Sequence, residues 1–514
     1  MCLFLKKDRL FVSGKTGKKD RLFCLLGNRE KKMELLSGNI KKIYFKYFAA
    51  TFGCSCISCI YGIVDMAVVG QYHGPDGTAA MSVVMPVFNI IYALGLLFGI
   101  GGSVLYSLEK GHDAGKNPDE NPQAKADPDN LQTGAGPDNT QAGADSGGKT
   151  GGSPGCQDEY FTVACAAAVI FSLLLWIILF AFDEELLYLF GADDDLIVLA
   201  MQYMAPLRYG APVFLFVELI GAFLRNDNAP GLATAAVIGS GIFNVFGDIF
   251  LVFGLDLGIM GAGIATCIGG GVSLLIMTAH FFSKKNSLRF VKIKGFARKF
   301  AQIVKNGFST FFADLSLGIV TVLFNRQIMT FLGSNALSVF GILMNLNTFV
   351  MCCGYSIGQS AQPIISTNLG AGKTDRIHTT TRCAIATTAV FGIMWIAIIF
   401  SVPELLVKLF MSPTEEVLQM APSIMRTYGI AFLFMPFNVF STYYFQSILR
   451  PATAMAISLA RGLFLSGALI MLLPVLFGAN AIWLAMPTTE IAVAIYAAGA
   501  MTRAERGKRR RVSF

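Results

Sequence analysis

The stretch GTAAMSV at residues 77–83 occurs again in altered form as GSNALSV at residues 333–339. A second stretch, GIGGS at 99–103, resembles SIGQS at 356–360, with nearly the same separation along the chain. Two motifs that recur in the same order and at the same distance indicate an internal duplication. We therefore expect the chain to fold as two related halves.

The composition decides the class of protein. Hydrophobic residues make up 54% of the 514 residues, and charged residues make up only 14%. A soluble domain carries about 25% charged residues. A helix needs roughly 20 apolar residues to cross a hydrocarbon layer about 30 Å thick, and apolar runs of that length recur along this chain. The sequence therefore predicts an all-α protein that crosses the membrane many times.

The apolar runs predict twelve membrane helices. We expect them at about 43–71, 78–108, 159–182, 196–224, 231–254, 259–282, 300–332, 337–366, 379–401, 416–447, 452–476 and 479–502. Each half then has six helices. Because six is even, both halves enter the membrane from the same side, which predicts two six-helix lobes related by a pseudo-two-fold axis along the membrane normal. Paired bundles of this kind are typical of transporters.

Basic residues predict the orientation in the membrane. They concentrate in the N-terminal arm, at 284–299, at 372–382 and in the C-terminal 503–514, whereas the opposite loops hold a single basic residue, Lys408. Basic loops mark the cytoplasmic side. We therefore expect a multi-pass protein of the cell membrane with both termini in the cytoplasm, and we attribute the net charge of +8 to orientation and anionic lipid rather than to nucleic acid.

Two polar regions interrupt this pattern. Residues 1–42 form a basic arm in which KKDRLF occurs twice, and whether residues 1–32 belong to the native protein stays open because Met33 is a possible start. Residues 111–158 are rich in Pro, Gly, Asp and Asn, a composition typical of disorder. We expect a disordered arm at 1–42 and a first lobe in two parts, 43–110 and 159–283, separated by a disordered cytoplasmic insertion at 111–158. A linking loop at 284–299, a second lobe at 300–502 and a basic tail at 503–514 follow.

Four polar side chains lie at one depth in the first lobe. Counted from the outer ends of their helices, Asp65, Asp248 and Thr266 each lie about two turns in, roughly 10 Å below the outer face, and Asn244 lies one turn below Asp248. Residues at i and i+4 share a helix face. We therefore expect these four oxygen-bearing side chains to converge.

A buried pair of carboxylates predicts a cation or proton site. Two carboxylates in a low dielectric do not both stay ionised without a proton or a metal ion between them. Asp65, Asn244, Asp248 and Thr266 offer only hard oxygen ligands, which suit Na⁺ or H⁺ as the coupling ion. The competing interpretation is a hydrogen-bond network that only holds the helices together. No cofactor other than the coupling ion is expected.

Other charged residues lie within predicted membrane helices. Such residues are costly in hydrocarbon and usually face a cavity. We consider Glu218, Asp314, Arg326 and Glu490 candidates for lining a substrate cavity, and Arg461 is a further buried cation. Arg326 and Glu490 have an alternative role as a structural pair with each other. Abundant Met and Phe suit an adaptable apolar wall that holds organic cations.

Several other chemistries find little support. The glycine-rich stretches GLLFGIGGS and GIMGAGIATCIGGG are not followed by Gly-Lys-Ser/Thr, so these two stretches do not indicate an ATP-driven pump, and the four histidines lack zinc spacing. Cys56 and Cys59 have the spacing of a redox motif, but they lie inside a predicted membrane helix. We therefore expect most of the eleven cysteines, including Cys352 and Cys353, to act as small apolar side chains.

The motifs resemble a known family. VDMAVVGQYHGPDGTAAMSVVMPVFNIIYALGLLFGIGGS, AFLRNDNAP followed by FNVFGDIFLVFGLDLGIMGAGIAT, and ILRPATAMA look like the multidrug and toxic compound extrusion (MATE) family. The similarity covers roughly residues 40–502. It implies two six-helix lobes around a cavity and export of organic cations or drugs driven by inward Na⁺ or H⁺.

The resemblance also implies site residues. In members with a cation site in the first lobe, an Asp of helix 1, an Asn and an Asp one turn apart on helix 5 and a Thr of helix 6 form it. Asp65, Asn244, Asp248 and Thr266 match these types and spacings. Some members also use acidic residues of helices 7 and 10. Asp314 is available here in helix 7, but Glu416 at the outer edge is the only carboxylate of helix 10.

The expected function is therefore secondary active antiport, with a small cationic or amphipathic molecule as substrate and the lipid bilayer as surroundings, carried out by a monomer that is not an enzyme. One alternative is a flippase for a lipid-linked or amphipathic envelope precursor, which a strongly basic cavity would favour. Another is an intramembrane aspartyl protease with Asp65 and Asp248 as its dyad. The segment that ends at Asp248 is VFGD, whereas such enzymes have Gly-x-Gly-Asp there. The internal duplication also has no role in such an enzyme.

Overall fold

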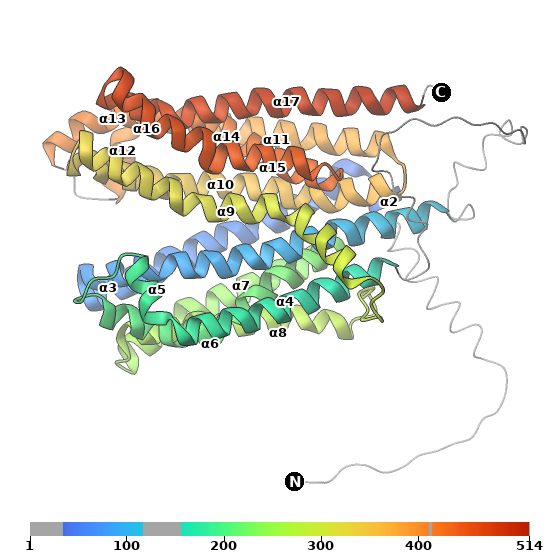
Figure 1. The fold of residues 1–514 in the computed structure, drawn as a ribbon, viewed down its shortest axis with the longest axis horizontal. Coiled ribbons are helices and arrows are strands. Elements are labelled where there is room, and N and C mark those ends of the chain that lie inside the picture. The colour runs from blue at the N-terminus through green and yellow to red at the C-terminus, as the bar shows by residue number, and fades with distance from the viewer. Residues whose placement is uncertain (1–33, 117–155, 411–413, 513–514) are drawn as a thin grey trace, which may run out of the picture.

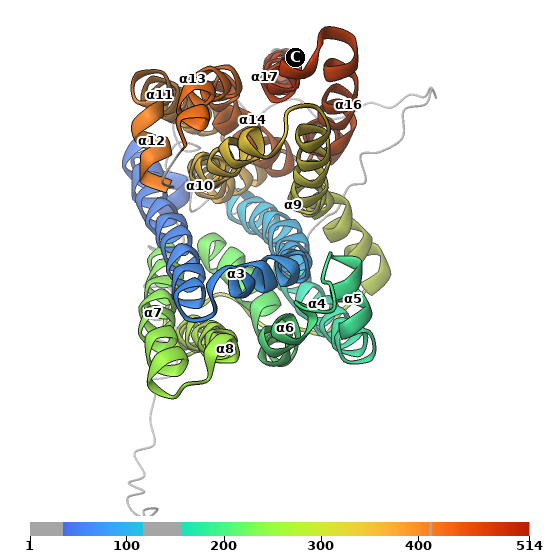
Figure 2. The same ribbon diagram turned by 90° about the vertical axis from the view of Figure 1, so that its left-hand side faces the viewer.

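The computed structural model describes residues 34–116, 156–410 and 414–512, and these residues contain helices and no strand. Two bundles of long helices lie side by side, one formed by α3 to α8 and the other by α9 to α17 (Figure 1). The view along the helices shows the same division into two groups (Figure 2). The predicted all-α architecture of two lobes is confirmed.

The first lobe, here called the N-lobe, begins with a long helix that turns back on itself. α3 (Ile40–Lys116) holds two membrane spans, Ile40–Gly74 and Asp76–Ala114. Gly74 separates them with φ 66° and ψ −151°, a backbone conformation that a side chain would disfavour. The rest of the lobe comprises α4 (Cys156–Ala181), α5 (Asp183–Leu189), α6 (Ile197–Asn226), α7 (Pro230–Asp248), η2 (Ile249–Gly254), α8 (Gly258–Thr278) and η3 (Ala279–Phe282).

The second lobe, the C-lobe, repeats this order. It comprises α9 (Phe296–Phe331), α10 (Ser334–Gly370), α11 (Thr374–Ser401), α12 (Pro403–Phe410), α13 (Glu415–Gly429), α14 (Ala431–Ser447), α15 (Pro451–Leu459), η4 (Ala460–Phe464), α16 (Leu465–Phe477), η5 (Ala479–Leu484) and α17 (Ala485–Val512). A short helix, α2 (Glu34–Ser37), precedes the N-lobe. It packs on the C-lobe, where Asn368 Nδ2 donates to the carbonyl of Leu35 at 3.1 Å.

Among the described residues, eleven helical spans are long and apolar enough to cross a membrane. The twelfth expected helix, 416–447, is present as two shorter helices, α13 and α14, which meet between Gly429 and Ala431. Pro422 and Pro436 also lie inside these pieces, and proline removes a backbone donor from a helix. The twelve-helix arrangement therefore holds, with one helix broken.

The polar regions differ in part from the prediction. Residues 40–42 and 111–116, expected to be disordered, belong to α3, and 503–512 of the tail extend α17. Residues 296–299 of the linking loop begin α9. These segments continue helices that start inside the membrane, so composition alone misplaced their ends. The expectations for 1–33 and 117–155 lie outside the described residues.

Large apolar side chains cover the outside of the helices. Phe246, Val322 and Leu275 are examples, with exposed fractions of 70%, 65% and 72%. In water such a surface would be unfavourable, whereas in lipid it contacts hydrocarbon. Each lobe has its own apolar core, one centred on Phe98, Phe161 and Phe223 in the N-lobe and others in the C-lobe.

Glycines bring the two lobes into close contact. A Cβ on Gly101 of α3 would lie 2.3 Å from the carbonyl oxygen of Ile303 in α9. A Cβ on Gly307 of α9 would lie 2.0 Å from the carbonyl oxygen of Leu97 in α3. The helices can approach this closely only because both positions lack a side chain. The second span of α3 therefore packs closely, backbone to backbone, on α9 of the C-lobe.

Candidate functional site

The four side chains predicted to converge come from three helices of the N-lobe. Asp65 lies on the first span of α3, Asn244 and Asp248 lie on α7, and Thr266 lies on α8. Asp65, Asn244 and Asp248 are buried, with exposed fractions of 7%, 3% and 0%, and Thr266 is half-buried. All three helices pack against one another.

Asn244 is at the centre of this cluster. Its Nδ2 lies 3.3 Å from Thr266 Oγ1 and 3.5 Å from Asp248 Oδ1. The carboxylates of Asp65 and Asp248 are close enough for their charges to interact. The structure therefore brings all four predicted residues together, as the depth argument expected. Their role in coupling stays a prediction.

Three oxygens in the cluster have no hydrogen-bond partner within the described ranges. Asp65 Oδ1, Asn244 Oδ1 and Asp248 Oδ2 are buried and have no hydrogen-bond partner among the described residues. A buried polar atom without a partner is costly, and proteins rarely leave several together. A proton or a hard cation such as Na⁺ would satisfy these oxygens.

Tyr203 is a fifth member that the sequence argument missed. It lies on α6, is buried, and its hydroxyl donates to Asp65 Oδ2 at 3.3 Å. Its ring is also within electrostatic reach of Asp248. Tyr203 lies about two turns from the Ile197 end of α6, which agrees with the depth counted for Asp65, Asp248 and Thr266.

The helix backbone changes directly after Asp248. Residues Ile249–Gly254 form a π-helix, η2, that continues α7. Such wider turns are rare and often occur at functional sites. Here the π-helix begins directly after Asp248, the last residue of α7.

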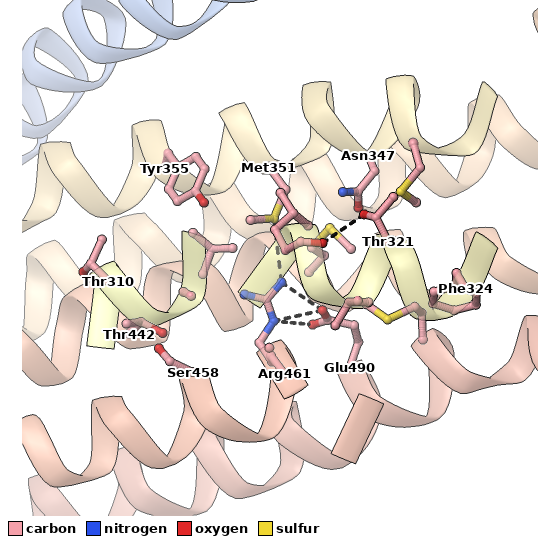
Figure 3. A pocket seen from close by; sticks show the side chains of 18 of the residues that line it. Thr310, Thr321, Phe324, Asn347, Met351, Tyr355, Thr442, Ser458, Arg461 and Glu490 are labelled. Carbon is pink, nitrogen blue, oxygen red and sulfur yellow. Dashed lines mark hydrogen bonds and ion pairs between the residues drawn. The ribbon is translucent and has the colours of Figure 1, made fainter. Parts of the chain in front are cut away.

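The C-lobe holds a separate cavity of about 60 Å³. Figure 3 shows its lining, with Met351, Phe324, Tyr355 and other side chains from α9, α10, α14 and α17. Its wall is mostly apolar and includes four methionines, Met344, Met351, Met435 and Met486. Methionine side chains adapt to differently shaped ligands.

Arg461 and Glu490 form an ion pair in the wall of this cavity. Arg461 Nη2 lies 2.9 Å from Glu490 Oε1, and its Nε donates to both carboxylate oxygens at 2.9 and 3.2 Å (Figure 3). Asn438 Nδ2 donates to the same carboxylate at 2.6 Å. Glu490 therefore lines a cavity, as expected, but the suggested pairing with Arg326 is wrong, because Arg461 of η4 takes that place.

The remaining predicted residues lie elsewhere. Asp314 accepts a hydrogen bond from the hydroxyl of Tyr355 at 2.5 Å, and Tyr355 lines the C-lobe cavity. Glu218 of α6 is half-buried and within electrostatic reach of Asp314 across the two lobes. Arg326 is exposed and does not line the cavity. Asp314 and Glu218 thus face one region, and Arg326 does not join them.

Comparison with known proteins agrees with this architecture. A family model described as MatE matches residues 51–119, 155–250 and 308–469, more than half of the chain. The multidrug export protein MepA of Staphylococcus aureus (strain MSSA476) is 23% identical over 432 residues, which cover 83% of this chain and 84% of MepA. MepA of Staphylococcus haemolyticus is 21% identical, with 84% of each chain covered.

Solved structures show the same fold. A multidrug resistance MATE family transporter in its outward-facing conformation superposes with a TM-score of 0.77 at 18% identity, covering 93% of this chain and 98% of that one. A MOP superfamily transporter from Pyrococcus furiosus, described as having a binding pocket of reversed polarity, superposes with a TM-score of 0.76 at 19% identity and covers 94% and 98% of the two chains.

Proposed function

Because this chain belongs to the MatE family of membrane transporters, we propose that it is a secondary active antiporter that exports organic cations or amphipathic drugs in exchange for inward Na⁺ or H⁺. The observation that carries the proposal is the set of three buried, unpartnered oxygens on Asp65, Asn244 and Asp248. These oxygens lie in the N-lobe, whereas the apolar cavity lies in the C-lobe. A coupling ion and a substrate thus have different places to bind.

The coupling ion acts on the carboxylates. A proton or Na⁺ that arrives from outside neutralises the pair of Asp65 and Asp248 and removes their repulsion. Asn244 and Thr266 supply neutral oxygens to the same ion. The helices that carry these side chains, α3, α7 and α8, then repack, and the N-lobe moves relative to the C-lobe. Such rocking of one bundle against the other is the general route to alternating access.

The substrate class follows from charge and wall chemistry. Asp314 of the C-lobe and Glu218 of the N-lobe are two carboxyl groups within electrostatic reach of each other, while Glu490 is paired with Arg461. Tyr355 and Tyr428 of the cavity offer aromatic faces, which attract organic cations. An amphipathic cation with an aromatic or apolar body therefore suits this region better than a strongly anionic lipid precursor. Because Arg461 is paired, the cavity is not strongly basic, which disfavours the flippase.

The test is gradient-driven efflux from proteoliposomes. Purified protein is reconstituted into liposomes, and these are loaded with each of a panel of fluorescent organic cations. Na⁺ and H⁺ gradients are then imposed separately. We expect one gradient to drive efflux of at least one compound, and Asp248→Asn to reduce the coupled rate at least tenfold. Asp256→Asn is the matched control, because Asp256 is exposed just beyond the same helix. Full coupled efflux by Asp248→Asn would overturn the proposal.

A further inference from the structure

A row of small polar side chains joins the N-lobe to the C-lobe. Thr51, Ser55 and Cys59 occur one helical turn apart on the first span of α3, and they face Cys352 and Ser356 of α10. Thr51 Oγ1 donates to the carbonyl oxygen of Ser356 at 2.9 Å, and the hydroxyls of Ser55 and Ser356 are 3.0 Å apart. The row is therefore continuous along the contact between two helices of different lobes.

The row ends in a pair of thiols. Cys59 Sγ lies 2.7 Å from Cys352 Sγ, so the two sulfur atoms already face each other across the lobe boundary. A disulfide has a sulfur–sulfur distance of about 2.05 Å, and a movement of less than 1 Å separates the two arrangements. Both residues are free cysteines and half-buried, near the middle of their membrane spans.

We propose that Cys59 and Cys352 are a reversible oxidation site whose disulfide locks the two lobes together and stops transport. The oxidant is a low-molecular-weight disulfide. One protein thiol displaces a thiol from it and forms a mixed disulfide, and the second protein thiol then displaces the other. In sum, two protein thiols lose two electrons and two protons, and the oxidant is reduced to two thiols.

The other cysteines near this row are differently placed. Cys56 lies one turn before Cys59 on α3, and Cys353 follows Cys352 on α10, but the second is buried. Among the described cysteines, the contact between Cys59 and Cys352 is the sulfur–sulfur contact that crosses the lobe boundary. Cys56 and Cys59 of one helix are therefore not the relevant pair, because the partner of Cys59 is Cys352 from the other half of the chain.

A covalent bond at this position would act on the movement itself. Alternating access requires one bundle to rock against the other. Hydrogen bonds such as those between Thr51 and Ser356 can break and re-form during each cycle. A disulfide between α3 and α10 does not break during the cycle, so it would hold the lobes in the arrangement in which α3 and α10 are in contact along this row. Reduction of the disulfide would restore movement.

The cross-link can be measured without any transport assay. A protease site inserted within residues 117–155 separates a fragment with Cys59 from a fragment with Cys352. Membranes are treated with diamide, which accepts two electrons and two protons and becomes a hydrazine, or with an oxidised low-molecular-weight thiol. After cleavage, we expect the fragments to migrate together on a non-reducing gel and apart after dithiothreitol. Cys59→Ser and Cys352→Ser should each abolish the link, whereas Cys56→Ser and Cys353→Ser should retain it.

Efflux is then measured in the same proteoliposomes. We expect oxidation to lower the rate at least fivefold in the unsubstituted protein and dithiothreitol to restore it, with no change in the Cys59→Ser/Cys352→Ser variant. Absence of the linked fragments would overturn the proposal, as would linking that persists in Cys352→Ser, linking only between two chains, or full transport by fully linked protein. Because the gel reports the bond directly, failure of the proposed antiport would not be mistaken for failure of this site.

Discussion

The hydroxyl of Tyr203 lies 3.3 Å from Oδ2 of Asp65 and connects α6 to the first span of α3. This contact leaves Oδ1 of the same carboxylate without a hydrogen-bond partner in the described part of the chain. One oxygen of Asp65 is thus held by a hydrogen bond, and the other is buried without one from any described residue. If the cluster binds the coupling ion as proposed, Tyr203 is a positioning residue for it.

Replacing Tyr203 with Phe should weaken ion coupling without unfolding the protein. The substitution removes one hydroxyl and keeps the ring, and a hydrogen bond to a charged group contributes about 1.5–3 kcal/mol. We expect the concentration of coupling ion needed for half-maximal efflux to change by about tenfold. Titration of the driving ion in proteoliposomes measures this. Tyr209→Phe on the same helix is the control, since Tyr209 is exposed, and equal behaviour of the two variants would contradict the role of Tyr203.

Breaking the buried ion pair of the C-lobe should destabilise the protein more than removing it entirely. Glu490→Gln leaves Arg461 without its carboxylate, and loss of one partner of a buried pair costs about 3–5 kcal/mol. The double variant Arg461→Met/Glu490→Met replaces both charges with side chains that suit the methionine-rich wall. We expect its unfolding temperature in detergent to exceed that of Glu490→Gln. The reverse order would show that the pair itself stabilises the lobe.

The sequence was sufficient to predict which residues lie at the same depth in the membrane. Asp65, Asn244, Asp248 and Thr266 could be predicted because each distance from a helix end fixes a level, and i, i+4 spacing fixes a face. Tyr203 was missed because its aromatic ring fits an apolar helix, so its single hydroxyl group does not stand out there. The length of the apolar runs explains why eleven spans of the described chain were found, while the break between α13 and α14 was not expected.

The sequence was not sufficient to predict which side chains of neighbouring helices pair, because this depends on how each helix is rotated about its axis. Glu490 has two arginines in neighbouring parts of the C-lobe, and only the packing of η4 against α17 selects Arg461 over Arg326. The contact between Cys59 and Cys352 joins the two halves of the chain, which no local spacing reveals. Contacts between lobes therefore required the structure.

Adding one methyl group at Gly307 should disturb the contact between the lobes. Its Cβ would lie 2.0 Å from the carbonyl oxygen of Leu97, a backbone atom that cannot turn away, so α3 and α9 must move apart. Overpacking of this kind costs about 1–3 kcal/mol. We expect Gly307→Ala to lower the unfolding temperature and the efflux rate. Gly318→Ala is the matched control on the same helix, because a Cβ there meets nothing within 4 Å.

Asp227 forms a buried charged cluster in the turn between α6 and α7, outside the membrane spans. It lies 2.7 Å from Lys110 Nζ and 2.9 Å from His280 Nε2, and the backbone N–H of Ser287 donates to it at 2.8 Å. Burial raises the pKa of Asp227, but the Lys110 ammonium and the hydrogen bonds lower it more, so the net pKa lies well below the ordinary range. The cluster fastens the loop after η3 to the N-lobe.

The lowered pKa of Asp227 fixes the direction of the pH dependence. A carboxylate with a lowered folded-state pKa stabilises the protein above its unfolded pKa of about 3.9, and this contribution is lost as the pH falls further. We therefore expect Asp227→Asn to lower stability by about 3–5 kcal/mol at neutral pH, because Lys110 loses its partner. The difference from the unsubstituted protein should stay constant from about pH 7 to 5 and shrink below about pH 4. Thermal unfolding in detergent across this range measures it, with Asp256→Asn as the exposed control, and a difference that grows in acid would contradict the assignment.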